Sequence, residues 1–226
     1  LLIDIQNNNT LLIHLGMTGK IFIINKNKKI TLKTSFYYNS DFIKKHNHLK
    51  IKFNNNIELI YNDVRKFGFI KLLKTDKTKN CINLLNLGPE PLSDEFNFSY
   101  MKSRVKKCKK NIKNFLMDQK YISGIGNIYA NEILFKSSIN PRKPVHKLNN
   151  HGINEILINT KKILEDSIRQ GGSTIRDFKS TSGQKGIFQQ SFMVYDRNNK
   201  DCMKRKCKGK IKKIYIGNRS TFFCKN

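Results

Sequence analysis

The stretch DQKYISGIGNIYANEILF, residues 118–135, decides the fold of this chain. Gly124 and Gly126 flank an apolar isoleucine directly before a segment predicted to be helical from about Asn127. Glycines at such a place let the main chain approach a partner closely, and a helix N-terminus presents free N–H groups and a positive dipole end. The pattern therefore fits a phosphate clamp on nucleic acid. An ordinary turn between two helices has the same pattern, so these residues alone leave both interpretations open.

The charge of the chain also indicates a polyanionic partner. Its 226 residues contain 44 Lys and Arg against 16 Asp and Glu, a formal net charge of +28. Such a surface attracts polyanions by long-range steering and counterion release, so nucleic acid is the leading partner and an anionic membrane surface the second. No apolar run approaches the ~18 residues of a membrane span, and no signal-peptide pattern opens the chain. The five cysteines, three of them bunched near the C-terminus, favour metal binding over a disulfide framework, so we expect a cytoplasmic protein.

The pattern along the chain predicts a β-rich part followed by a helical part. Seven short β-branched runs separated by Asn- and Gly-rich turns occupy residues 1–92: LLIDI, TLLIHLG, KIFIIN, KKITLKT, HLKIKF, IELIYND and FGFIKLL. The punctuation LGPEPLSDEF predicts a domain boundary there. From about 93 to 171 the signal is helical, and the longest helix is expected to end at Gly171-Gly172. Its apolar face is predicted to contain Ile153, Ile156, Leu157, Ile163, Leu164 and Ile168.

Two turns carry large side chains that could fill a gap in a base stack. HLGMTGK, residues 14–20, presents Met17, and YNDVRKFGFI, residues 61–70, presents Arg65 and Phe67. An enzyme that extracts a base from duplex DNA needs such a wedge. On spacing alone, two hairpin turns whose Met and Phe belong to the core are the more frequent explanation.

The C-terminal part combines three of the five cysteines with many basic residues. Cys202 and Cys207 are followed by Cys224 on a predicted β-hairpin, and zinc ribbons place cysteine ligands on such hairpins. Three unrelated thiols and a merely solvated basic face remain the alternatives. The preceding stretch QGGSTIRDFKSTSGQKGIFQQ, residues 170–190, has the length and composition of a binding loop or of a passive linker.

In their order along the chain, these motifs resemble the bacterial formamidopyrimidine-DNA glycosylases. HLGMTG, D-x-R-x-FG, LGPEPL, LMDQKYISGIGNIYANEILF, GGST-x-x-DF and GNRSTFFC occur here in the family's sequence, and the resemblance covers nearly the whole chain. It implies an α+β fold: part of an N-terminal β-sandwich (residues 1–92), a helix-two-turn-helix domain (93–192) and a zinc-finger hairpin (193–226). It also implies a base-excision repair enzyme that removes oxidised purines and nicks the abasic strand by β- and δ-elimination through a Schiff base.

The resemblance assigns roles to individual residues. Met17, Arg65 and Phe67 match the residues that fill the void left by the flipped base. Phosphate or DNA contacts are implied for His46, Lys109, Lys113, Asn127 and Arg219, with Arg219 also assigned to δ-elimination. The segment that closes over the flipped base is implied to contain Ser182, Gly183, Gln184, Lys185 and Gly186. The implied cofactor is one Zn²⁺ held by Cys202, Cys207 and Cys224, with the fourth cysteine expected just beyond Asn226.

The chain departs from the family at both ends and in the zinc knuckle. Cys202 and Cys207 enclose four residues, where the family usually has two. The family's N-terminal Pro-Glu and its catalytic Lys are not found, and the chain opens with Leu1 inside an apparent strand, so we expect an inactive, monomeric fragment. The alternatives are an endonuclease VIII-like enzyme for oxidised pyrimidines and a non-catalytic nucleic-acid-binding protein.

Overall fold

The computed structural model describes residues 1–25, 30–34, 44–173 and 188–225. The chain divides into two compact units. Unit 1 comprises Leu1–Leu84 with Gln170–Gln189, and unit 2 comprises Leu85–Arg169 with Gln190–Asn226. In sequence, the short helix α1 (Ile82–Leu85) spans the division. No helix in the described ranges combines the length and the apolarity that crossing a membrane requires.

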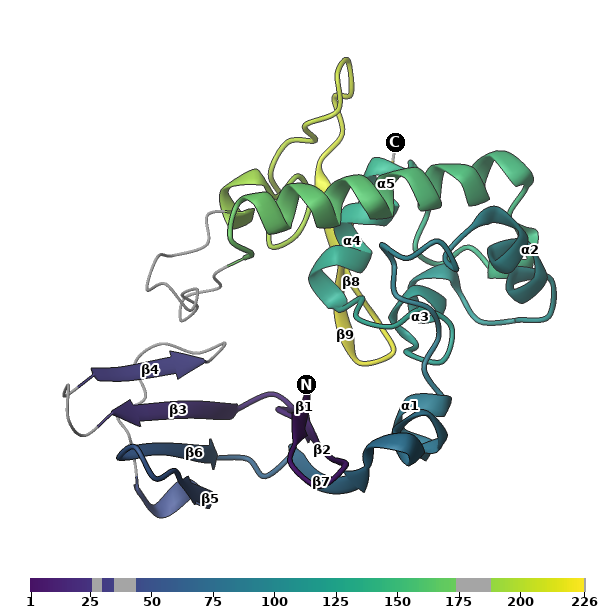
Figure 1. Ribbon diagram of the computed structural model, residues 1–226. Coiled ribbons are helices and arrows are strands. Elements are labelled where there is room, and N and C mark those ends of the chain that lie inside the picture. The colour runs from purple at the N-terminus through teal and green to yellow at the C-terminus, as the bar shows by residue number, and fades with distance from the viewer. Residues whose placement is uncertain (26–29, 35–43, 174–187, 226) are drawn as a thin grey trace. The chain divides into compact units, whose positions relative to one another are not determined.

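Unit 1 consists of two antiparallel sheets (Figure 1). The first has the order β1-β2-β7, built from Leu2–Ile5, Asn9–His14 and Phe69–Lys74. The second has the order β4-β3-β6-β5, built from Ile30–Thr34, Gly19–Asn25, Ile57–Asp63 and Asn47–Lys52. Each of the seven predicted runs forms a strand, so the prediction of β structure is confirmed. Two 3₁₀ helices, Lys44–His46 and Thr75–Asn80, complete the described connections.

The core of unit 1 lies between the inward faces of β2, β3 and β6. Ile13, Ile21 and Tyr61 are buried there, each at most 5% exposed. Partly buried apolar residues pack around them: Leu11, Leu15, Ile23, Leu49, Leu59 and Ile70. Successive side chains of a strand point to opposite faces, so Ile60 of β6 is buried on the other face of the sheet, at the register position of Phe22 in β3.

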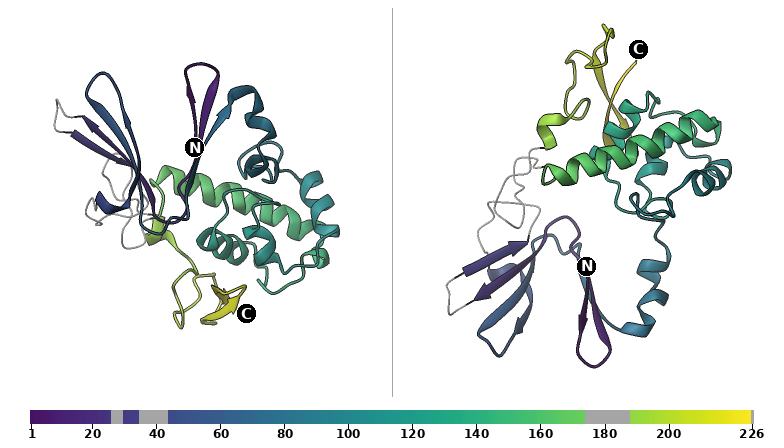
Figure 2. Two further views of the ribbon diagram at one scale, coloured as in Figure 1. Left: turned by 90° about the horizontal axis from the view of Figure 1, so that it is seen from below. Right: turned by 45° about the horizontal axis from the view of Figure 1, so that its top comes forward.

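Unit 2 is helical and ends in a β-hairpin. Its helices are α2 (Phe98–Lys106), α3 (Ile112–Met117), α4 (Asn127–Lys136) and α5 (Asn150–Arg169), with a 3₁₀ turn at Val145–Lys147. A further 3₁₀ turn, Phe188–Ser191, spans the division between the units in sequence. The hairpin pairs β8 (Ile211–Ile216) with β9 (Arg219–Cys224). Figure 2 shows α5, in green, as one unbroken helix. The fold is therefore α+β, as predicted.

The predicted apolar face of α5 is confirmed except at its last position. Ile153, Ile156 and Ile163 are buried, and the helix ends two residues before Gly171, which has a φ of +72°. Ile168, however, is 66% exposed. It is the penultimate residue of α5, so this apolar position is not part of the buried face.

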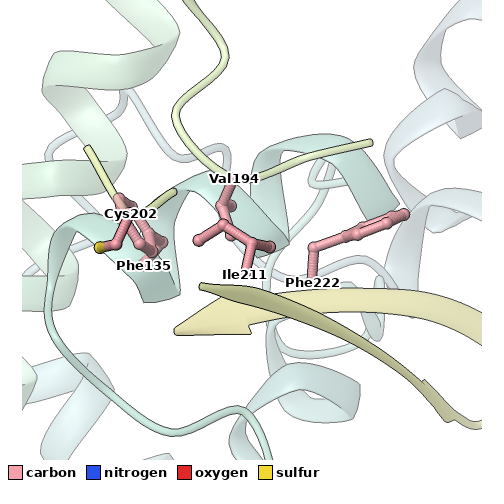
Figure 3. Packing of buried hydrophobic residues seen from close by; sticks show 5 residues of the cluster. All are labelled: Phe135, Val194, Cys202, Ile211 and Phe222. Atoms are coloured by element: carbon pink, nitrogen blue, oxygen red, sulfur yellow. The ribbon is translucent and has the colours of Figure 1, made fainter. Parts of the chain in front are cut away.

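A second apolar cluster fixes the hairpin to the helices. Phe135 of α4, Val194, Cys202, Ile211 of β8 and Phe222 of β9 are all buried and in contact (Figure 3). Val194 is 0% and Ile211 is 0% exposed. In the close-up, Val194 and Ile211 lie at the centre, while Cys202 lies beside Phe135. The cluster joins the helical part to the cysteine-containing segment, which has few other apolar residues to bury.

Candidate nucleic-acid interface

Two glycine-containing turns of unit 1 lie against each other. One joins β2 to β3 and the other joins β6 to β7. Gly16 has a φ of +58°, and a Cβ on it would lie 2.8 Å from the carbonyl carbon of Phe67. A Cβ on Gly68 would lie 2.5 Å from the carbonyl oxygen of His14. Because no side chain fits at either place, glycine is required for the two main chains to approach this closely.

Asp63 holds the two turns together. It is the last residue of β6 and is 0% exposed. Its Oδ1 atom accepts hydrogen bonds from the hydroxyl of Thr18 and, at 3.2 Å, from the N–H of Arg65. Its Oδ2 atom accepts from the N–H of Gly68 at 2.9 Å and from the hydroxyl of Tyr61 at 3.1 Å. Burial disfavours the charged carboxylate, but these hydrogen bonds favour it more strongly, so the pKa of Asp63 lies below its usual value.

The side chains that these turns present are Met17, Arg65 and Phe67. Met17 is 43% and Phe67 is 55% exposed, so the alternative that they belong to the core is wrong. Nη1 of Arg65 lies 3.5 Å from the sulfur of Met17, and its Cζ lies 4.5 Å from the ring centroid of Phe67. The guanidinium thus stacks on the aromatic ring in a cation–π contact. The structure brings these three predicted residues together into one projecting group, which we call the turn triad.

His48, which is not among the predicted DNA contacts, is bonded to the main chain of Asp63, the residue that holds the two turns. Nε2 of His48 lies 2.8 Å from the main-chain oxygen of Asp63, and its ring is tilted against that of Tyr61. The selected His46 is half-buried at the end of the 3₁₀ helix before β5. The two histidines are two residues apart in HNH, and only the strand register, unknown from sequence, distinguishes them.

The predicted glycine turn before α4 is present. Gly124 has a φ of +79°, and a Cβ on Gly124 or Gly126 would meet nothing within 4 Å, so the turn faces open space. Gln119 braces it: its side-chain oxygen accepts from the N–H of Gly124 at 2.7 Å, and its amide donates to Ile125 O at 3.2 Å. Gly126 caps α4 without a side chain. The first N–H groups of α4 therefore have no side-chain cap.

The β8–β9 hairpin turns next to the start of α4. Gly217 and Asn218 have φ values of +55° and +56°, the conformation of a tight two-residue hairpin turn. A Cβ on Gly217 would lie 2.9 Å from Oδ1 of Asn114, so the hairpin tip lies against α3. Arg219 follows as an exposed residue at the start of β9. The side-chain amide of Asn127 donates to Ser220 O at 3.1 Å, which brings the predicted phosphate contacts Asn127 and Arg219 to the same place.

Lys113, for which the resemblance implies a DNA contact, is buried against the hairpin. The side chain is 0% exposed, and its ammonium donates to Ser220 O at 2.9 Å and to Oγ1 of Thr221 at 2.6 Å. Burial, and secondarily the charge of Arg219, lowers the pKa of Lys113 to about 8. α3 thus turns Lys113 toward the hairpin and away from solvent, and its implied DNA contact stays a prediction. Lys109, four residues earlier, is exposed before α3.

The predicted lesion-loop residues lie outside the described part of the chain: Ser182, Gly183, Gln184, Lys185 and Gly186. Beyond this segment, the main chain is anchored by Glu132 of α4, which the sequence reasoning missed. Its carboxylate accepts hydrogen bonds from the N–H groups of Met193 at 2.9 Å, Val194 at 3.1 Å and Tyr195 at 2.8 Å. Glu132 is 4% exposed. The available signal was an acidic residue inside the apolar run ANEILF.

The three C-terminal cysteines converge, as predicted. The sulfur atoms of Cys202, Cys207 and Cys224 all lie within 4.8 Å of one another, and those of Cys207 and Cys224 are 3.7 Å apart. Zn–S bonds of ~2.3 Å in a tetrahedron imply sulfur–sulfur separations of about 3.8 Å. The cluster is therefore compatible with a zinc finger, and the four residues between the first two cysteines do not prevent convergence.

Comparisons with known proteins agree with this geometry. Residues 1–70 match the formamidopyrimidine-DNA glycosylase N-terminal domain, and residues 87–179 match the formamidopyrimidine-DNA glycosylase H2TH domain. The formamidopyrimidine-DNA glycosylase of Rickettsia bellii is 38% identical over 100% of this chain and 77% of the relative. That of Dinoroseobacter shibae is 34% identical over 99% of this chain and 78% of the relative.

Solved structures support the same assignment. Lactococcus lactis Fpg in complex with abasic-site DNA has a TM-score of 0.80 and 31% identity, covering 99% of this chain and 76% of that one. A mutant of the same protein, bound to DNA that contains Fapy-dG, has a TM-score of 0.81 at 31% identity and the same coverage. With the turn triad, the glycine turn before α4 and the cysteine cluster all in place, the chain belongs to the formamidopyrimidine-DNA glycosylase family.

Proposed function

We propose that this protein is a base-excision repair DNA glycosylase and abasic-site lyase that acts on oxidised purines in duplex DNA. The observation that carries the proposal is the match to formamidopyrimidine-DNA glycosylases over 99–100% of the chain, at 34–38% identity. Its structural counterpart is the exposed turn triad, which offers an apolar wedge and a cation on one rigid base. The related Lactococcus lactis protein was solved with DNA carrying an abasic site and with DNA carrying Fapy-dG.

In this proposal, the turn triad fills the space that the flipped nucleotide leaves. Met17 and Phe67 replace lost base stacking, and Arg65 presents hydrogen-bond donors to the unpaired base opposite. Because Asp63 fixes both turns by hydrogen bonds to main-chain and side-chain donors, the wedge is rigid before DNA arrives. A preorganised wedge loses little conformational entropy on binding, which favours extrusion of the damaged base.

A second group of residues holds the DNA backbone. Asn127 and the first N–H groups of α4 bind one phosphate, and Arg219 contacts a phosphate and assists its departure during δ-elimination. Exposed Lys109 and half-buried His46 add cationic or hydrogen-bonding contacts to DNA. We further propose the segments 1–92, 93–192 and 193–226 as the functional domains, and a monomer as the active form.

The cysteine cluster would hold one zinc ion in this proposal. Cys202, Cys207 and Cys224 supply three thiolates, which suit zinc in both softness and spacing. The ion would neutralise the thiolates and lock the hairpin that carries Arg219. Its role is structural.

Duplex binding tests the proposed function. Fluorescence anisotropy of the 226-residue protein should show tighter binding to a duplex with a tetrahydrofuran abasic analogue opposite cytosine than to the undamaged duplex. Phe67→Ala should remove most of this preference. Phe53→Ala is the matched control, since Phe53 is 49% exposed in the same unit and lies outside the two turns.

The same assay separates the alternatives. A preference for thymine glycol over 8-oxoguanine duplexes would indicate an endonuclease VIII-like enzyme. Equal affinity for damaged and undamaged duplexes would overturn the proposal in favour of a non-catalytic nucleic-acid-binding protein.

A further inference from the structure

Lys113 is a buried cation without an acidic partner. It is the second residue of α3 and is 0% exposed, and none of the ion pairs found among the described residues includes it. Its ammonium donates instead to two neutral oxygens, Ser220 O and Thr221 Oγ1. Burying an ammonium in this way is costly, and an apolar side chain of similar size would pack at lower cost. A lysine at this position therefore needs a reason other than stability.

Both oxygens that bind the Lys113 ammonium belong to the two residues directly after Arg219. Ser220 directly follows Arg219, and its carbonyl accepts a second hydrogen bond from the side-chain amide of Asn127 at 3.1 Å. Thr221 Oγ1 donates in turn to the carbonyl of Arg219 at 3.1 Å. Lys113 from α3 and Asn127 from α4 thus meet on one main-chain oxygen, next to the exposed arginine.

The remaining contacts of this region complete a rigid frame. Oδ1 of Asn131 accepts from the N–H of Phe222 at 2.7 Å, and the Asn131 amide donates back to the main-chain oxygen of Asn127 at 2.6 Å. Three consecutive residues of β9, from Ser220 to Phe222, are therefore held by side chains of α3 and α4. Arg219 is the first residue of the strand outside this frame.

We propose that Lys113 is a positioning residue: it fixes the main chain at Ser220 and Thr221 so that Arg219 is presented to a phosphate beside Asn127, without touching DNA itself. This inference rests on the proposed DNA-binding function. It assigns to Lys113 a role through Arg219 in place of an independent phosphate contact.

A double-mutant cycle on DNA affinity tests this role. Lys113→Met removes the ammonium and keeps the length of the side chain. In the otherwise unchanged protein, we expect it to weaken binding to an abasic-analogue duplex about tenfold. It should also reduce the log–log salt slope by about 0.9, the contribution of one lost phosphate contact. In an Arg219→Ala background, the same substitution should change affinity less than about twofold, because its effect is transmitted through the missing arginine.

Independent contacts would give a different result. If the losses of Lys113→Met and Arg219→Ala multiply, and the salt slope falls by about 0.9 for each, Lys113 binds phosphate directly and the proposal is overturned. The undamaged duplex gives the same cycle, because only phosphate is read. A failure of lesion preference therefore refutes the proposed enzyme without affecting this test.

A second variant covers the case in which Lys113→Met loosens the whole hairpin. Thr221→Val removes one acceptor of the ammonium and keeps the shape of the buried side chain. It should weaken DNA binding about threefold when Arg219 is present and not when Arg219 is alanine. An equal loss in both backgrounds would overturn the proposal.

The pH dependence of DNA affinity is a further readout, because a purely structural role of Lys113 would not give one. Arg219 is the charged group that acts on Lys113, and its other neighbours in this frame, Asn127, Ser220 and Thr221, are neutral. A phosphate bound at Arg219 would favour the ammonium form. Wild-type affinity should therefore fall between pH 7 and 9 with uptake of up to one proton on binding, and Lys113→Met should abolish this dependence. Identical pH profiles for both proteins would count against the proposal.

Discussion

Replacing Glu132 by alanine should destabilise unit 2 more than any single surface substitution. The carboxylate is 4% exposed and accepts hydrogen bonds from three consecutive main-chain N–H groups, those of Met193, Val194 and Tyr195. Removal leaves these donors without their acceptor beside a residue, Val194, that is itself 0% exposed. Each buried donor left unpaired costs about 1–3 kcal/mol. Because some water can enter the space, we expect a total loss of about 3–5 kcal/mol.

Urea unfolding followed by circular dichroism measures this loss. With a slope of about 2–3 kcal/mol/M, the midpoint should fall by about 1–2.5 M without a change in slope. Hydrogen exchange should localise the effect, with faster exchange at the amides of residues 193–195 than elsewhere. Glu132→Gln, which keeps one acceptor oxygen, should lose about half as much.

Glu165→Ala is the matched control, since Glu165 is an exposed glutamate of α5. It should change the free energy of unfolding by less than about 0.5 kcal/mol. If Glu132→Ala costs less than about 1 kcal/mol, or no more than the control, the three hydrogen bonds are not the anchor that we infer.

Three further perturbations have defined outcomes. Asp63→Asn should cost about 1–3 kcal/mol of stability and weaken abasic-duplex binding, because the two turns lose their common acceptor. The pKa of Asp63 is lowered in the folded protein, so its contribution to stability is present at neutral pH and is lost as the pH falls below ~3.9 through the lower folded value. Acid unfolding curves of the wild type and of Asp63→Asn should therefore differ in this range. Coincident curves would contradict the hydrogen-bond network around Asp63. A chelator should remove about one zinc per chain and lower the unfolding temperature. Cys207→Ser should likewise lower both the zinc content and the unfolding temperature. Cys108→Ser, outside the cluster, should leave the zinc content unchanged. Met17→Ala should weaken binding to the abasic duplex about tenfold and to the undamaged duplex little, and equal losses on both would show that Met17 does not act as a wedge.

Local patterns predicted the elements and several site residues of this protein. Strand runs, the end of α5, the glycine turn and the meeting of the three cysteines all follow from spacing and composition over a few residues. The turn triad was also predicted, although its exposure could not be: whether Met17 and Phe67 point inward depends on the pairing of β3 with β6, 45 residues apart at Thr18 and Asp63.

The failures have a common physical cause. Lys113 and Glu132 are charged residues whose partners are main-chain or hydroxyl groups far away in sequence, and Asp63 joins nearby main-chain groups to Thr18, 45 residues earlier. Neither charge nor periodicity distinguishes a solvated lysine of α3 from one that is turned toward the hairpin. For this reason the sequence predicts a DNA contact for Lys113 and gives no role to the two carboxylates.

The carbonyl of Ser220 has a consequence for how such proteins diverge. Lys113 and Asn127 bind an oxygen that every amino acid carries, so residue 220 can be exchanged freely while the contact persists. Covariation between position 113 and position 220 is therefore not expected, even though a hydrogen bond joins the two residues directly. A contact made through the main chain would appear among relatives as conservation at positions 113 and 127 with variability at position 220. A comparison of side chains alone would miss this contact.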